Sequence, residues 1–96
     1  MQAVATATYT EIIVQEGVAL NGDLILSQIT SIPPRASYEV ALAPTDVVLG
    51  GLRVASTICP GKLFTLNERL ITRKLGMHTV EKLTAVRVAL RQLLNL

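Results

Sequence analysis

The sequence predicts a mainly β domain that ends in a single amphipathic helix. Short runs of β-branched and apolar residues alternate with glycine, proline and asparagine turn signals over most of the chain. After Gly76 the apolar residues change from the period of a strand to that of a helix. The chain has 96 residues, which is enough for one domain and too few for two. We therefore expect one domain over residues 1–96.

The first third of the chain predicts strands joined by a tight turn. Residues 1–9 are small and polar and predict a lead-in or a weak edge strand. Residues 10–14 are β-branched and predict a strand, and residues 24–29 predict a second, buried one. Asn21-Gly22 lies between these apolar runs and is a strong signal for a hairpin.

A third strand is predicted over residues 37–42, where apolar and polar side chains alternate. This alternation gives a half-buried strand whose inner face carries Tyr38, Val40 and Leu42. Pro33-Pro34 ends the preceding strand, because proline cannot donate to a sheet ladder.

Two further strands are expected over residues 52–59 and 62–66, separated by a turn at Pro60-Gly61. Asn67 can cap a short helical turn. Residues 70–75, closed by Gly76, fit a strand or a helix equally well. The pattern thus gives five to six short strands.

The C-terminal helix is predicted to begin after Thr79, a good N-cap, and to end near residue 94. Its apolar stripe has helical spacing and consists of Leu83, Val86, Leu90, Leu93 and Leu94. Short strands followed by one helix describe a small barrel or sandwich with a helix packed on it.

The net charge of +2 is divided unevenly along the chain. Residues 1–48 hold five acids and one base, a net charge of −4, whereas residues 49–96 hold eight bases and two acids, a net charge of +6. A basic C-terminal half can face nucleic-acid phosphates. The alternative is an ordinary solvated surface.

Several classes of site and location are disfavoured by the sequence. Cys59 is the single cysteine, which predicts a buried filler and neither a disulfide nor a metal cluster. His78 has no catalytic partner at a known motif spacing, so we expect a surface or capping role. No run reaches the ~18 apolar residues of a membrane span, and the N-terminus does not read as a signal peptide. These features predict a cytoplasmic protein without a metal or cofactor.

One polar cluster has chemical potential. Hydroxyl, amide and guanidinium groups gather at the end of the strand at 24–29, on Ser27, Gln28, Thr30, Ser31 and Arg35. Such groups can hydrogen-bond a phosphate or stabilise a pentacovalent phosphorane. The alternative is ordinary hydrogen bonding within a strand end and turn.

The order of segments resembles the MazF/PemK family of endoribonuclease toxins from type II toxin–antitoxin systems. Here "QITSIPP" is followed by "YEVAL", by "GLRVASTICPGKLFTLNERLITRKLG" and by a helix that ends in "LRQLLNL". The family has an "ITS"-like turn, a strand like "FEVPL", a run like "PSVVRADKLRTLD" and an "RLG" junction before its last helix. The resemblance covers residues 24–96.

The resemblance implies a small Src-homology-3-like barrel of the CcdB/PemK type, with the C-terminal helix packed on it. It also implies a homodimer, a cognate antitoxin, and metal-independent cleavage of single-stranded RNA. The family's catalytic threonine matches Thr30, followed by Ser31. On the hypothesis of an endoribonuclease, the residues that we expect to bind RNA are Ser27, Gln28, Arg35, Arg53 and Lys62.

The chain also departs from the family pattern. The family's catalytic arginine precedes an apolar strand, where this sequence has Tyr9 and Thr10, and no arginine or lysine precedes Arg35. The family's opening strand has no counterpart. Two alternatives therefore remain. One is a degenerate or truncated family member that only binds RNA, an antitoxin or a protein target such as gyrase. The other is an unrelated β-rich interaction domain.

Overall fold

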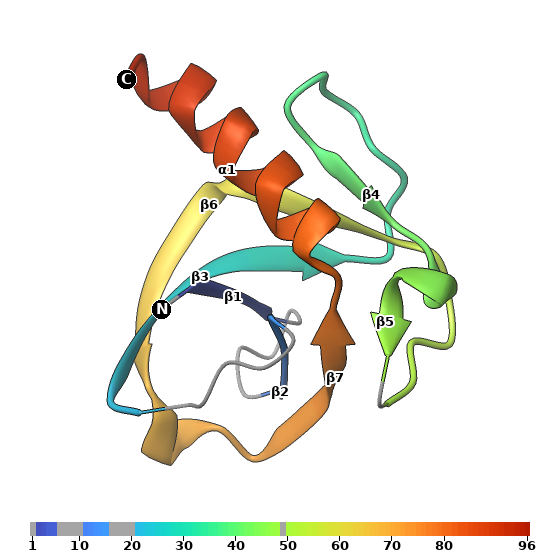
Figure 1. Ribbon diagram of the computed structural model, residues 1–96, viewed down its shortest axis with the longest axis vertical. Helices are drawn as coiled ribbons and strands as arrows, with labels where there is room; N and C mark the ends of the chain where they lie inside the picture. The colour runs from blue at the N-terminus through green and yellow to red at the C-terminus, as the bar shows by residue number, and fades with distance from the viewer. Residues whose placement is uncertain (1, 6–10, 16–20, 49) are drawn as a thin grey trace.

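The computed structural model describes residues 2–5, 11–15, 21–48 and 50–96. Within them, seven strands form one sheet in the order β4-β6-β3-β1-β2-β7-β5, followed by a single helix (Figure 1). The elements are β1 (Gln2–Ala5), β2 (Glu11–Gln15), β3 (Asp23–Thr30), β4 (Val40–Leu42), η1 (Pro44–Asp46), β5 (Val47–Val48), β6 (Ser56–Asn67), η2 (Glu68–Leu70), β7 (Arg73–His78) and α1 (Val80–Leu94). The predicted mainly β fold with one C-terminal helix is confirmed.

The first strand lies in the middle of the sheet. β1 pairs antiparallel with β2 and parallel with β3, so it separates the two strands that we expected to form a hairpin. The predicted hairpin at Asn21-Gly22 is therefore wrong. Gly22 instead adopts a φ of 92°, and its carbonyl accepts a hydrogen bond from the Glu68 N–H at 3.0 Å. Of the expected lead-in, residues 6–9 lie outside the described residues, and residues 2–5 form an inner strand and not an edge.

The sheet curls but its described strands do not close into a hydrogen-bonded barrel. β4 and β5 are its two edges, and the short η1 turn joins them (Figure 1). Lys82 of α1 holds this corner, because its Nζ lies 2.9 Å from the Ala41 carbonyl oxygen and 3.5 Å from Asp46 Oδ2. A lysine on the outer side of an edge strand hinders pairing with another chain.

β6 is one long bent strand and not two strands joined by a turn. Cys59 pairs with Gln28, whereas Leu63 pairs with the adjacent Ser27, so residues 60–62 bulge out of the ladder. Pro60 has no N–H to donate, which favours a bulge at this point. The predicted turn at Pro60-Gly61 is therefore wrong, although these two residues do lie at the bend of β6.

Two apolar clusters lie on the strands. The first packs between the sheet and α1 and contains Ile13, Ile29, Leu42, Val47, Ile58 and Val86. The second lies on the opposite face, since Ile12 and Val14 flank Ile13 in β2, and contains Ile12, Val14, Leu24 and Leu26, with Phe64 and Leu66 packed against it. The core thus consists of aliphatic side chains, as the shortage of aromatic residues requires.

The boundaries of three strands differ from their predictions. Residues 37–39 form a turn closed by the hydrogen bond from the Glu39 N–H to the Ala36 carbonyl, and the side chain of Tyr38 is 39 % exposed. β6 begins at Ser56, four residues later than expected. β7 passes through Gly76, where a Cβ would lie 2.6 Å from Val47 Cγ1 of β5, so the glycine permits close approach of the edge strand.

The helix begins where the sequence predicts. Thr79 is its N-cap residue, although the Thr79 side chain makes no capping hydrogen bond. Leu83 and Val86 are buried as expected, but Leu93 and Leu94 are 40 % and 57 % exposed, so the C-terminal end of the predicted core stripe is wrong. The helix extends past the sheet at this end (Figure 1).

The first cluster should carry much of the stability. Leu42 is fully buried in it, so Leu42→Ala should lower the free energy of unfolding by about 2–5 kcal/mol through lost burial and a residual cavity. Urea titration followed by circular dichroism measures this. Leu70→Ala is the control, because Leu70 is 58 % exposed and its loss should change stability by less than about 0.5 kcal/mol. Equal losses for both variants would contradict the assigned core.

Candidate functional site

A set of polar side chains shares one face of the sheet where β3, β6 and β4 run side by side. In the register, Gln28 lies opposite Cys59, and Thr30 lies opposite Thr57. Their neighbours Ile29 and Ile58 pack in the cluster under α1, so alternation places the polar residues on the opposite face. We call Gln28, Thr30, Glu39, Thr57 and Cys59 the polar array.

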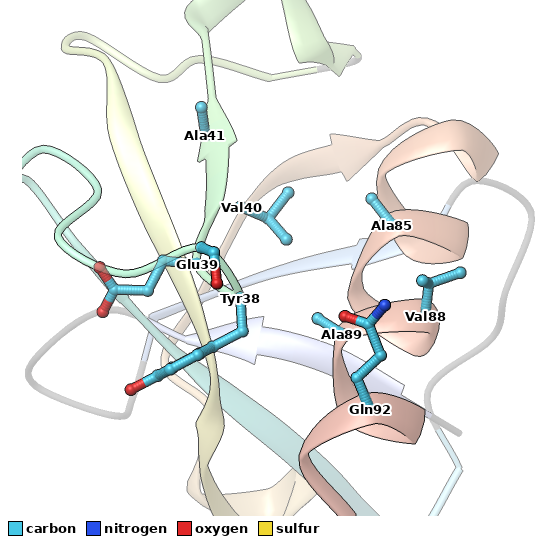
Figure 2. Close-up of a pocket in the computed structure, with 9 residues that line it drawn as sticks. Tyr38, Glu39, Val40, Ala41, Ala85, Val88, Ala89 and Gln92 are labelled. Atoms are coloured by element: carbon cyan, nitrogen blue, oxygen red, sulfur yellow. The ribbon is translucent and has the colours of Figure 1, made fainter. Parts of the chain in front are cut away.

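Glu39 joins the array from the turn before β4. Figure 2 shows its carboxylate pointing away from α1, whereas Val40 points toward the helix across a groove of about 430 Å³. Glu39 Oε1 accepts a hydrogen bond from the Arg35 N–H at 2.6 Å, and Oε2 accepts one from Cys59 Sγ at 3.6 Å. The Arg35 N–H bond is the main reason why the pKa of Glu39 lies below its ordinary value of 4.5. The carboxylate is therefore ionised at neutral pH.

Cys59 lies at the centre of the array and is only 2 % exposed. Burial raises the pKa of its thiol above the ordinary 9.0, and the charge and hydrogen bond of Glu39 raise it further. The positive charges of Lys62 and Arg35 act on this pKa in the opposite direction. Both of these predicted RNA-binding residues are thus close enough to the array for their charges to act on it.

Two threonine hydroxyls complete the array. Thr57 is 1 % exposed, and its Oγ1 has no hydrogen-bond partner among the described residues. Thr30 is half-buried at the end of β3, and its Oγ1 accepts a hydrogen bond from the Ile32 N–H at 3.3 Å. The Thr30 hydroxyl therefore makes a hydrogen bond within the turn that follows β3, which is the ordinary strand-end bonding considered as the alternative, and its side chain stays partly accessible. Ser31, the next residue, is exposed.

Other predicted site residues lie outside the array. Ser27 is fully buried beside the β6 bulge, so the structure leaves it out of the site. Arg53 is exposed in the segment before β6 and makes no hydrogen bond or ion pair with the array among the described residues. His78, expected at the surface, is 2 % exposed in β7, where its Nδ1 lies 3.0 Å from the Thr79 carbonyl oxygen.

Sequence reasoning missed three members of the array. Thr57 and Cys59 lie far from Thr30 in the sequence and are brought to it by the order β4-β6-β3, whereas Glu39 lies close to Arg35 in the sequence and reaches the array through its bond with Cys59. The alternation of side chains along the strands could have predicted which face these residues share. Glu39 faces away from Val40, and Thr57 and Cys59 flank the apolar Ile58. The pairing of the three strands was the missing information.

Comparison with known proteins gives no family assignment. No protein-family model matches the chain, and no curated protein matches it. Across the described ranges, no group of three or more histidine, cysteine, aspartate or glutamate side chains can hold a metal ion. The one described helix is too short and too polar to cross a membrane.

The ionised Glu39 should make stability depend on pH. Because its pKa is lower in the folded chain than the ordinary 4.5, its charge stabilises the fold above that value, and this contribution is lost as the pH falls through the folded pKa. Glu39→Gln should therefore be less stable than wild type near pH 7. The difference should shrink as the pH falls from about 5 to 3. Urea titrations of both proteins over this range measure it, and two parallel pH curves would contradict the assignment.

Proposed function

We propose that this chain is a MazF/PemK-like toxin that cleaves single-stranded RNA, typically mRNA, in the cytoplasm and so inhibits growth. The observation that carries the proposal is the polar array. In it, Thr30 lies opposite Thr57, whose hydroxyl has no hydrogen-bond partner among the described residues. The positive charges of Arg35 and Lys62 act on Cys59 of the same array. Hydroxyls beside cations suit the oxygens of a phosphodiester. The order of segments in the sequence supports the same function.

The proposed reaction is transesterification within the RNA. The ribose 2′-oxygen attacks the adjacent phosphorus, the bond from phosphorus to the 5′-oxygen breaks, and the products are a 2′,3′-cyclic phosphate and a 5′-hydroxyl. Thr30 would donate a hydrogen bond to the phosphate as negative charge develops on it. Arg35 and Lys62, both exposed, would stabilise that charge.

The choice of RNA over DNA follows from this chemistry, because the nucleophile is the 2′-hydroxyl. A single-stranded substrate is supported by Tyr38, which is 39 % exposed and directly precedes Glu39 in the chain. Aromatic side chains beside a phosphate site commonly stack on unpaired bases. Gln28 is half-buried in the array and can hydrogen-bond the substrate backbone or base.

We also propose a protein partner for the exposed apolar surface. Several large apolar side chains of α1 and the residues after it are at least two-fifths exposed, namely Val80, Val88, Leu93, Leu94 and Leu96. An apolar surface of this kind favours coverage by a second copy of the chain or by an antitoxin. A size measurement by light scattering, alone and with the protein encoded by a neighbouring gene, tests this.

Removal of the Thr30 hydroxyl should abolish most of the activity. Thr30→Ala should reduce the cleavage rate by about 10²–10³-fold, as for other groups that stabilise a developing oxyanion. The assay uses a labelled single-stranded RNA in EDTA and detects the cyclic phosphate. Thr65→Ala is the matched control, because Thr65 is an exposed threonine in the other half of β6. Equal cleavage by Thr30→Ala would indicate a contaminating nuclease and contradict the proposal.

The two cations should govern RNA affinity. Arg35→Gln and Lys62→Gln should each weaken binding, and each should lower the slope of log K against log salt by about 0.7 if one phosphate contact is lost. Arg91→Gln is the control, because Arg91 lies in the last turn of α1, away from the array. Fluorescence anisotropy of a 2′-deoxy-substituted RNA, which binds but is not cleaved, measures affinity. Unchanged slopes would exclude these side chains from the interface.

A further inference from the structure

We propose that Glu39 is the general base of this site and takes the proton from the ribose 2′-hydroxyl. The inference rests on the proposed RNA cleavage and assigns a catalytic role that the sequence did not indicate. Glu39 is the one carboxylate in the polar array, on the same sheet face as Thr30 and Thr57. A base must remove the 2′-proton for the oxygen to attack.

Glu39 and Thr30 lie on neighbouring parts of the same sheet face. β4 and β3 are separated only by β6, so their backbones lie roughly 10 Å apart at ordinary sheet spacing. Ala41 is level with Thr57 and Thr30 in the register, so Glu39 is offset from Thr30 along the strands and lies nearer to Gln28 and Cys59. The side chains of Thr30 and Glu39 both extend from the same face, and Glu39 reaches back over β6 as far as Cys59. In the proposed arrangement the phosphate is held at Thr30 and its neighbouring ribose lies toward Glu39.

The hydrogen bonds of Glu39 orient it for this role. The Arg35 N–H fixes Oε1, and the Cys59 thiol donates to Oε2, so the carboxylate is held in one position before substrate arrives. The carboxylate is ionised at neutral pH, as a base must be. Each carboxylate oxygen has a second lone pair, which remains available for the 2′-hydroxyl proton.

The step balances with water as the only other reactant. Glu39 accepts the 2′-proton as the 2′-oxygen forms its bond to phosphorus. The 5′-oxygen leaves with the electrons of the broken bond and takes a proton from water. Glu39 then returns its proton to solvent, and the enzyme is restored without a metal or cofactor.

Glu39→Gln tests the assignment, because glutamine keeps one oxygen for the Arg35 N–H and removes the base, while its NH2 group replaces the oxygen that accepts from the Cys59 thiol. Wild-type kcat/KM should be nearly independent of pH between 5.5 and 8.5, since Glu39 is ionised throughout. Glu39→Gln should be about 10²–10⁴-fold slower at pH 7, and its kcat/KM should rise tenfold per pH unit as hydroxide replaces the base. A structural role alone would lower the rate without introducing this slope.

A substrate with sulfur in place of the bridging 5′-oxygen tests whether Glu39 acts as a base on the 2′-hydroxyl or as an acid on the leaving group. This leaving group needs no proton, so Glu39→Gln should be slowed on it by the same factor as on ordinary RNA. Restoration to the wild-type rate would overturn the assignment, because Glu39 would then act on the leaving group. Glu39→Asp, a shorter base, should keep a flat pH profile with a lower rate, and a tenfold rise per pH unit would contradict the proposal.

The two proposals fail in different ways. If wild type shows no Thr30-dependent cleavage, RNA cleavage itself fails and the inference fails with it. If wild type cleaves and Thr30→Ala does not, but Glu39→Gln matches wild type in rate and pH profile, only the role of Glu39 fails. Matched circular dichroism melts of the variants ensure that folded proteins are compared.

Discussion

The shift of register between β3 and β6 is the constraint on which the rest of the molecule depends. Across one step of β3, from Ser27 to Gln28, the partner strand advances from Leu63 to Cys59. The three extra residues bend β6, so that its first half pairs with both β3 and β4 and its second half continues along β3 alone. Such a bulge bends the strand and increases the local twist of the sheet.

Strand alternation explains how a small chain with three aromatic residues fills two clusters. On one face of the sheet, the cluster around Ile58 packs under α1, and on the other face Leu24 and Leu26 lie with Phe64. Each cluster is thin, because a chain of this length buries only about two-thirds of its unfolded surface. The α1 helix and the Lys82 contacts at the β4 corner hold the arrangement together.

The sequence predicted the parts of the fold that depend on local period. The strand at β3 and the helix after Thr79 each have a clear pattern, and both are present. The errors occur where distant segments decide the structure. Asn21-Gly22 has the composition of a hairpin turn, yet β1 enters between the two strands that it should join. Leu93 and Leu94 continue the helical stripe, but Leu93 meets β6 only near Gly61 and both side chains stay largely exposed.

The candidate site follows the same rule. Thr30 and Arg35 were found because they lie within a few residues of each other, whereas Thr57 and Cys59 needed the order of the strands. Alternation alone gives the face of a residue but not its neighbours across the sheet. Three-dimensional pairing therefore converts a strand-end cluster of hydroxyls into an array with a carboxylate and a buried thiol.

In the proposed reaction, the charge on the phosphate is stabilised from the edge of the array. A preorganised cation inside the site would stabilise the phosphorane directly, but the charges here come from Arg35 and Lys62 at the exposed rim. Arg35 has a double role in this arrangement. Its backbone N–H fixes Glu39, and its guanidinium makes no hydrogen bond or ion pair among the described residues. In the proposed mechanism, the turn that positions Glu39 would therefore also present the Arg35 cation to the phosphate, so that both roles would depend on one short segment before β4.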